Sequence, residues 1–570
     1  MLLRCAIQLS ICGEHRAEVT HSQPISLVRF LAGGTTRGTR EPCHTNRSLY
    51  VTAPTLCKSM DTLRCVESLA SRPRRPTAQV GSTNLTISPS NNVDSRLAVA
   101  DPDGVDMNRW HPIKIKHVSV NVLALFLLCL CATPTLAVPS FARQTGMACA
   151  ACHTVFPELT PFGREFKLNG YVLDNIRQVT GIDTANRQTL AINSIPPVSA
   201  MVQVSYTHTS KALPDGGLPG ALAKDGEVLF PQQVSLFYAG KIADELGAFM
   251  QLTFDGAADH FGFDNTDIRY AHHLSFGGTN ANDHHLILGL TLNNNPTVQD
   301  AWNTIPAWGF PYSGSNVAPG QIASAQIDGR LGQSVAGLGV YVWLDDHFYA
   351  EITGYTAAVV GGAHPLDSTQ SNVAHGLSPY WRLAYEQRWD RNSLSVGTYG
   401  IETKIHPGGG TALQGTTDEY TDIAVDAQYQ FIGEEHLATV LATYIHEKQA
   451  LNASLFDQFS ANAADTLKTL KLTAEYSYLR HIGGSLGFFS TTGSVDTILY
   501  PVAPVAGSAN SSPNTKGYIA ELNYLPWLNV KLQLQYVAYE KFNGLKTNYD
   551  GTGRNASDNN TLYGLIWVNF

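Results

Sequence analysis

The chain has 570 residues, of which 44% are hydrophobic and 15% charged, and its formal net charge is −9. From Val138 onward, 23 Lys and Arg stand against 38 Asp and Glu, a formal charge of −15. This acidic balance argues against a nucleic-acid partner and suits cationic partners such as metal ions and basic electron carriers.

Residues 1–106 show no sustained period of 2 or 3.6 residues and are rich in Arg, Ser, Thr and Pro, as in Ser71–Pro76. They precede a complete export signal whose own Met107 is a candidate initiator. Two readings remain open: upstream sequence that is not part of the natural protein, or a disordered extension. Neither predicts a fold.

Residues 107–137 have the three parts of a secretory signal peptide. Met107–Lys116 is a basic n-region, Val118–Ala132 an apolar h-region and Thr135–Ala137 a small-residue cleavage site. A transmembrane helix is the competing interpretation, but the apolar run is shorter than the roughly 20 residues that a spanning helix needs. We therefore expect export and a mature chain that starts near Val138.

The most specific motif is Cys149-Ala150-Ala151-Cys152-His153, a C-x-x-C-H run of the kind that attaches a c-type haem. Of nine cysteines, only Cys149 and Cys152 follow the signal, so a zinc site would lack its second ligand pair. A thioredoxin-like motif would need a βαβ frame, which the sequence does not suggest. We predict one covalent c-type haem, attached through Cys149 and Cys152, with His153 as the proximal iron ligand.

The cytochrome segment, residues 138–196, is too small for a stable free-standing domain, so we expect it to dock as a plug inside a barrel. Thr160 followed by Pro161 predicts a helix start, and Asn169-Gly170 predicts its end about two turns later. Three basic residues are candidate partners of the haem propionates, with ordinary solvated charges as the alternative: Arg143, Arg164 and Lys167.

Residues 197–570 alternate apolar and polar side chains, as in Leu470–Tyr478 and Val530–Tyr536, which is the period of a strand with two different faces. The pattern predicts sixteen strands. Their ranges are 198–210, 228–240, 246–256, 265–276, 284–293, 333–344, 347–358, 378–389, 392–403, 418–432, 436–447, 467–480, 483–494, 516–525, 528–541 and 560–570.

The connections alternate in length, with short turns after even-numbered strands, such as Asp345-Asp346, and long loops after odd-numbered ones. Short periplasmic turns and long extracellular loops are typical of outer-membrane barrels. The chain also ends on Phe570, with Leu562, Gly564, Ile566 and Val568 on the same face of the last strand. The expected fold is mainly β, a porin-like, 16-stranded antiparallel outer-membrane barrel with a cytochrome plug; a soluble β-sandwich is the alternative.

The sixth iron ligand is left open by the sequence. Met147 lies too close to Cys149 to reach the opposite face of a haem easily. Other residues become candidates if they face the lumen: Met201, His208, Met250, His272 and His273. A methionine ligand would raise the redox potential relative to a second histidine.

Together, Ala137–Gly146, Cys149–His153 and Pro157–Tyr171 resemble the signature of the fused outer-membrane cytochrome–porins of iron-oxidising bacteria. The resemblance covers about 35 residues closely and the barrel only in size and pattern. It implies a monohaem cytochrome that takes electrons from extracellular Fe(II), although the family also includes members whose donor need not be Fe(II).

Fe(II) prefers hard oxygen ligands with some imidazole. We expect an acidic loop between the third and fourth strands to be where Fe(II) arrives, with a solvated loop as the alternative. Its residues are Asp255, Asp259, His260, Asp264 and Asp267.

The predicted function is therefore electron transfer from an external donor, such as Fe(II), through the haem to a periplasmic carrier, in a protein embedded in outer-membrane lipid. The sequence contains no nucleophile elbow, P-loop or Rossmann fingerprint between a strand and a helix, which argues against hydrolase or nucleotide chemistry. Two alternatives stay open: a solute channel with a haem-containing plug, and a soluble periplasmic cytochrome.

Overall fold

The structure is a computed structural model that describes residues 140–214, 224–277, 284–357, 373–407 and 416–570, all within one compact unit. The predicted signal peptide at 107–137 and residues 1–106 lie outside these ranges, so they stay predictions. None of the helices in the described residues has both the length and the hydropathy needed to span a membrane.

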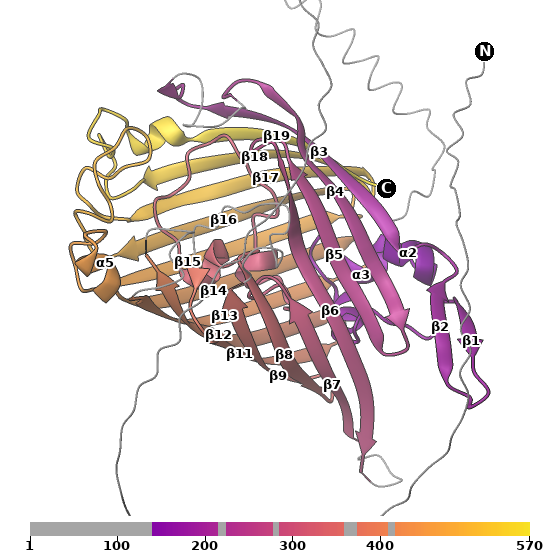
Figure 1. The fold of residues 1–570 in the computed structure, drawn as a ribbon. Coiled ribbons are helices and arrows are strands. Elements are labelled where there is room, and N and C mark those ends of the chain that lie inside the picture. Colours follow the sequence, from indigo (N-terminus) through magenta and orange to yellow (C-terminus); the bar gives the residue numbers. More distant parts are fainter. Residues whose placement is uncertain (1–139, 215–223, 278–283, 358–372, 408–415) are drawn as a thin grey trace, which may run out of the picture. The chain divides into compact units, whose positions relative to one another are not determined.

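Antiparallel strands close into a barrel (Figure 1). The ring is complete because β9 pairs with β11 and β19 pairs with β3. Its sixteen strands are β3 (Val198–Thr209), β4 (Val228–Ala243), β5 (Leu246–Asp255), β6 (His260–Phe276), β7 (His284–Asn293), β8 (Val335–Leu344), β9 (Phe348–Ala357), β11 (Ser378–Trp389), β12 (Asn392–His406), β13 (Asp418–Ile432), β14 (His436–Ala450), β15 (Ala464–Tyr478), β16 (Ile482–Gly493), β17 (Thr515–Trp527), β18 (Val530–Lys541) and β19 (Thr561–Asn569).

All sixteen predicted strands are confirmed, and ring closure excludes the β-sandwich alternative. The two-residue strand β10 (Val373–Ala374), which pairs with β12, was not predicted. The expected loop parity fails once, because β5 and β6 are joined by a tight turn at 256–259 instead of a long loop. The Asp345-Asp346 turn is present as expected, and both residues have positive φ, which suits a two-residue hairpin turn.

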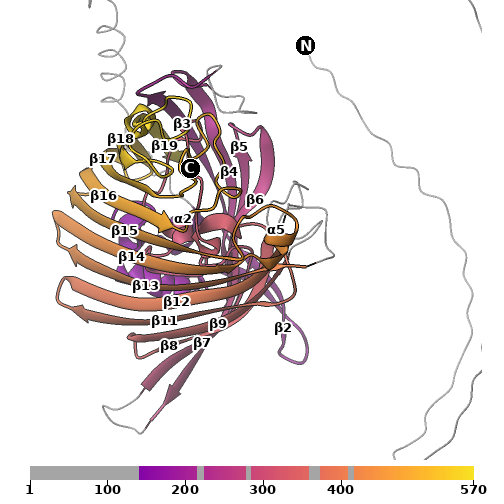
Figure 2. The ribbon, with the colours of Figure 1, turned by 90° about the vertical axis from the view of Figure 1, so that its left-hand side faces the viewer.

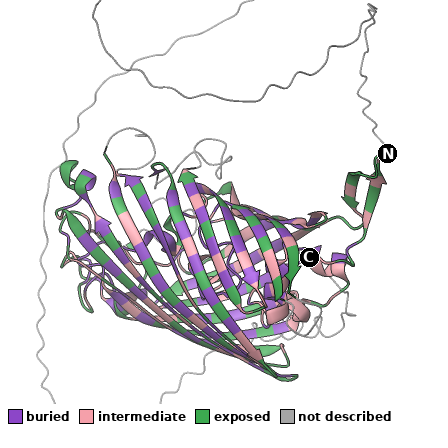
Figure 3. Ribbon diagram, turned by 90° about the horizontal axis from the view of Figure 1, so that it is seen from below, coloured by how far each residue is buried: buried purple, intermediate pink, exposed green. Residues whose placement is uncertain are grey.

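The outer face of the barrel is apolar, and many of the side chains that the strands turn inward are polar. Figure 3 shows buried and exposed residues alternating along the strands. Leu338, Ile352, Leu486 and Leu522 are each 64–69% exposed on the outer face. Buried polar side chains alternate with such residues along the strands, as in β17, where Glu521 is 4% exposed. This alternation matches a barrel whose outer surface contacts lipid.

The plug segment enters the ring before β3. It contains α2 (Ser140–Thr145), α3 (Cys149–Cys152), α4 (Pro161–Leu168) and the hairpin β1 (Gln178–Ile182) and β2 (Gln188–Asn193). The hairpin was not predicted, and it lies outside the ring, at the end where the C-terminus lies (Figure 1). In Figure 2 the purple plug helices lie behind β13, β14 and β15, which face the viewer.

The helix α4 begins and ends as predicted. The Thr160 side chain accepts a hydrogen bond from the Gly163 amide at 3.1 Å, and Pro161 occupies the first turn. Asn169 caps the C-terminus, and Gly170 adopts a positive φ of 66° directly after it.

Ion pairs and hydrogen bonds connect the plug segment to the barrel wall. Arg164 bonds Glu386 of β11 at 2.7 Å, and both side chains are at most 1% exposed. Tyr171 donates to Asp267 of β6 at 2.7 Å, and the Tyr341 hydroxyl of β8 donates to the Leu168 carbonyl at 2.6 Å.

A second segment, the connection between β7 and β8, also lies in the lumen. Residues 294–334 join β7 to β8 and fold inward, with Trp302 and Ile305 fully buried. They include η2 (Pro306–Trp308) and a short π-helical turn, η3 (Gln326–Arg330). The sequence predicted this connection as an extracellular loop; the structure places it inside the ring, where its apolar side chains are shielded from water. The short helix α5 (Asn452–Phe456) lies between β14 and β15, and η4 (Ala556–Asn559) precedes β19.

Candidate functional site

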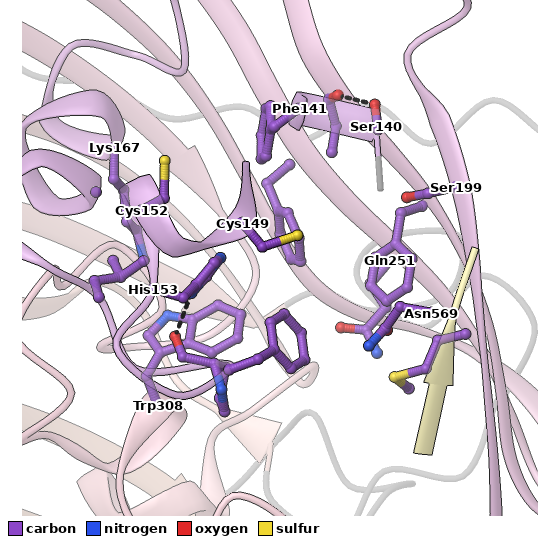
Figure 4. Close-up of a pocket in the computed structure, with 18 of the residues that line it drawn as sticks. Ser140, Phe141, Cys149, Cys152, His153, Lys167, Ser199, Gln251, Trp308 and Asn569 are labelled. Atoms are coloured by element: carbon purple, nitrogen blue, oxygen red, sulfur yellow. Dashed lines mark hydrogen bonds between the residues drawn. The ribbon is translucent and has the colours of Figure 1, made fainter. Parts of the chain in front are cut away.

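The C-x-x-C-H motif forms one helical turn at the edge of a cavity. The His153 amide donates to the Cys149 carbonyl at 2.9 Å, which closes the turn. Residues three apart share a helix face, so Cys149 and Cys152 both line this cavity, whose volume is about 400 Å³. Figure 4 shows the motif on one side, with Gln251 and Asn569 on the other.

The His153 ring is held in the orientation that a metal ligand needs. Its Nδ1 lies 3.2 Å from the Pro157 carbonyl oxygen, which can only accept, so Nδ1 carries the proton. Nε2 then keeps its lone pair for a metal ion. Burial lowers the pKa of His153 and favours the neutral ring. The motif therefore presents a pre-oriented neutral imidazole.

Residues after the motif fix its backbone. The Thr160 hydroxyl donates to the Ala151 carbonyl at 2.6 Å, and the Thr160 amide donates to the Cys152 carbonyl at 2.9 Å. Gly163 packs so closely that a Cβ there would lie 2.2 Å from the Cys152 carbonyl oxygen. A glycine is required at this position for α4 to lie directly against α3.

The cavity is mostly apolar. Its volume falls within the roughly 300–1,000 Å³ typical of small-molecule sites. Aromatic side chains from the plug, the wall and the 294–334 segment line it: Phe141, Phe156, Phe166, Phe237, Phe249, Trp308 and Trp567. Two thiols on one helical face, an adjacent imidazole and an aromatic cavity fit a large, flat, apolar cofactor bound through two thioethers.

The thiols do not have the character of a redox C-x-x-C. Burial raises the pKa of Cys152 to about 11, with a further contribution from Cys149, and burial also raises the pKa of Cys149. Redox-active pairs instead hold their nucleophilic thiol at a lowered pKa. The site thus disfavours the redox alternative.

The three candidate propionate partners make different contacts in the structure. The Arg164 guanidinium donates to Glu386, Gln428, Gln430, Ser393 and the Leu159 carbonyl, so it anchors the plug to the wall, and its role as a propionate partner stays a prediction. Arg143 donates to the Val198 carbonyl.

Lys167 alone among the three lines the cavity. Its Nζ donates to the Val298 carbonyl at 2.6 Å and lies 4.8 Å from the centre of the Trp308 ring. Burial, together with the positive charge of Arg269, lowers the pKa of Lys167 to about 7. Its role as a propionate partner stays a prediction.

The candidate sixth ligands differ in whether they line the cavity. Met147 and Met201 line the cavity, and no other candidate does. His208 is exposed on β3, and Met250 lies between the cavity-lining Phe249 and Gln251, so its side chain points to the other face of β5. His272 bonds Glu245 at 2.8 Å, and His273 bonds Asn169.

The five residues of the expected Fe(II) arrival loop do not converge. Asp255 and His260 face each other across the β5–β6 hairpin, and Asp259 occupies its turn. Asp264 and Asp267 lie within β6, which begins at His260 and not at 265 as predicted. Asp264 accepts from Gln333 at 2.7 Å, and the buried Asp267 pairs with Arg269 at 2.7 Å. Within the described ranges, no group of three or more His, Cys, Asp or Glu is placed to hold a metal ion.

The cavity-lining residues opposite the motif were not predicted from the sequence. Trp567 contacts Phe156 edge-to-face at 5.1 Å, and Phe156 contacts His153 at 5.2 Å between ring centroids. Strand alternation could have placed Trp567 and Met201 in the lumen. No local signal could have indicated that Trp308, from the irregular segment 294–334, would join them.

No family model matches the sequence, and no similar curated protein was found. Among solved structures, an OmpF complex with daunomycin from Salmonella typhi aligns at 11% identity over 65% of this chain and 97% of its own, with a TM-score of 0.38. An anion-selective porin from Comamonas acidovorans aligns at 14% identity over 65% and 98%, with a TM-score of 0.36. The barrel assignment rests on the strand pairings of this chain itself.

Proposed function

We propose that this chain is an outer-membrane electron-transfer protein that carries electrons from an extracellular donor, Fe(II), to a periplasmic carrier. One c-type haem, bound through Cys149 and Cys152 with His153 on the iron, supplies the one-electron chemistry. The supporting observation is the motif's position: its thiols and imidazole line an apolar cavity inside a closed barrel with an apolar outer face. The resemblance to cytochrome–porins of iron oxidisers supports Fe(II) as donor.

The residues of the chain have definite tasks in this proposal. Pro157 fixes the His153 tautomer through its carbonyl, and aromatic side chains make much of the cavity wall apolar. Gly163 and Thr160 hold the attachment turn in place. A rigid, mostly apolar surrounding limits reorganisation when charge changes, which suits electron transfer.

A solute channel is the second candidate, because barrels of sixteen to eighteen strands commonly enclose an aqueous channel. The plug and the 294–334 segment occupy the lumen and form buried ion pairs with the wall, among them Arg164–Glu386 and Asp300–Arg382. These fixed contacts favour the conduit over an open pore.

The test is stopped-flow spectroscopy of haem absorbance in oxidised outer-membrane fractions after addition of Fe(II). The control is a Cys149→Ala/Cys152→Ala preparation. Rapid reduction at a rate that saturates with Fe(II) supports the proposal. Haem that dithionite reduces but Fe(II) does not would remove Fe(II) as the donor, and solute conductance in planar bilayers without redox turnover would favour the channel.

A further inference from the structure

We infer that the barrel wall itself supplies the sixth ligand to the haem iron, through the thioether sulfur of Met201 on β3. This inference rests on the proposed function, because it requires haem at the Cys149–His153 turn. It adds a structural consequence: the iron would be bound from the plug on one side and from the barrel on the other.

The position of Met201 on β3 makes this possible. Met201, Gln203, Ser205 and Thr207 are all buried and alternate with outward-facing residues, so Met201 points into the lumen. Met201 is 3% exposed and lines the same cavity as His153. The two residues come from different elements, the wall and the plug, as two axial ligands on opposite faces of one haem must.

The packing around Met201 leads back to the motif. Met201 clusters with Tyr563, Leu565 and Trp567 of β19, and Phe156 packs against this cluster. Phe156 also contacts the His153 ring edge-to-face, at 5.2 Å between centroids. Met201 and His153 thus border one continuous aromatic pocket, which is the setting of an apolar cofactor.

The other donors lining the cavity are less suited. Met147 precedes Cys149 by two residues, so the thioether bonds would hold it beside the attachment turn. Lys167 lies on α4, which packs directly against α3 at Gly163, and its Nζ is already engaged with the Val298 carbonyl. Met201 is the one soft donor of the cavity wall that belongs to the barrel, among the residues that line the described cavity.

The chemistry of the ligand has a functional consequence. A methionine ligand raises the haem potential relative to a second histidine. A higher potential makes electron acceptance from a mild donor such as Fe(II) more favourable. The choice of Met201 would therefore match the site to its proposed donor.

The experiment compares haem spectra, carbon monoxide binding and midpoint potential in three variants of the full-length protein. Met201→Leu keeps the apolar volume and removes the sulfur, Met201→His substitutes an imidazole, and Met250→Leu is a matched control on the opposite strand face. We expect the unmodified protein and Met250→Leu to be six-coordinate and low-spin. Met201→Leu should become high-spin and bind carbon monoxide in its reduced form, and Met201→His should regain low spin at a lower potential.

Covalent haem content is measured in every sample, so that failure of folding or attachment is separated from loss of a ligand. A Met201→Leu protein that retains haem and keeps the unmodified protein's spectrum would overturn the ligand assignment but leave the proposed function standing. A five-coordinate spectrum of the unmodified protein would also overturn it. Absence of haem from the unmodified protein would instead refute the proposed function.

Discussion

The two sides of the barrel lumen differ sharply in chemistry. Toward β3, β4, β5 and β19, the wall presents Met201, Phe237, Phe249 and Trp567 to an open cavity. Toward β11 and β13, charged side chains bind the plug and the inward-folded segment directly, and Arg382 pairs with both Asp300 and Asp426 at 2.7 and 2.9 Å. One side fixes the plug by hydrogen bonds and ion pairs, and the other leaves a mostly apolar cavity beside its motif.

This division separates two tasks that a cofactor-carrying plug must perform. A buried ion pair is strongly destabilised when either partner is lost, so such pairs suit permanent docking of the plug. An apolar cavity gains free energy from any apolar group of fitting shape, so it suits a cofactor. Perturbing each side should therefore produce a different defect.

The largest effect should follow from removing the attachment chemistry on the apolar side. We predict that Cys149→Ala/Cys152→Ala loses all covalently bound haem, because both thioether bonds are gone. The barrel should still insert into the membrane, since both thiols lie outside the barrel strands and their pairings. Haem staining after denaturing electrophoresis measures the first outcome, and heat-modifiable migration measures the second. Stained protein in this variant would refute the attachment site.

The substitution Arg164→Ala tests the charged side of the lumen, because it removes the ion pair with Glu386. Removing one partner of a buried ion pair costs about 3–5 kcal/mol, because Glu386 is left buried with only Arg388 and the Trp302 indole N–H to compensate its charge. The plug should then become sensitive to protease while the strands stay resistant. Arg391→Ala is the control, since its pair with Glu434 is largely exposed and is worth only about 0–1 kcal/mol. Equal protease sensitivity in both variants would contradict the anchoring role of Arg164.

The outer face of the barrel can be tested separately from both lumen sides. Leu486 is 69% exposed in the middle of β16, and Leu486→Arg should cost about 2–4 kcal/mol of folding free energy in a bilayer. Val495→Arg, just beyond the end of β16 and 57% exposed, should cost far less. Urea titration of refolding into lipid vesicles measures both. Equal stability of the two variants would indicate that the apolar face does not contact lipid.

A smaller effect should come from the contact between α3 and α4. Gly163→Ala places a Cβ against the Cys152 carbonyl, and overpacking of this kind costs about 1–3 kcal/mol. Displacement of the attachment turn should reduce the haem content of the purified protein. Gly564→Ala has open space around its Cβ and is the control. Unchanged haem occupancy in Gly163→Ala would mean that the turn tolerates the shift.

The sequence predicted the strands well because each strand alternates between lipid and lumen, and that period is local. The ends of α4 were equally local, through Thr160, Pro161 and Gly170. Contacts within the lumen were not local. Arg164 and Glu386 are 222 residues apart, so the sequence alone could not show that Arg164 pairs with Glu386. The same holds for Asp267, whose hydrogen bond with Tyr171 depends on the docked plug.

The central claim is that the Cys149–His153 turn carries a covalent haem inside the barrel. The most direct measurement is the intact mass and absorbance spectrum of the protein purified from outer membranes of cells able to mature c-type cytochromes. The account predicts the mass of the polypeptide plus one haem, with the absorbance bands of a c-type cytochrome. A polypeptide mass without haem, in a barrel that is correctly inserted, would contradict it.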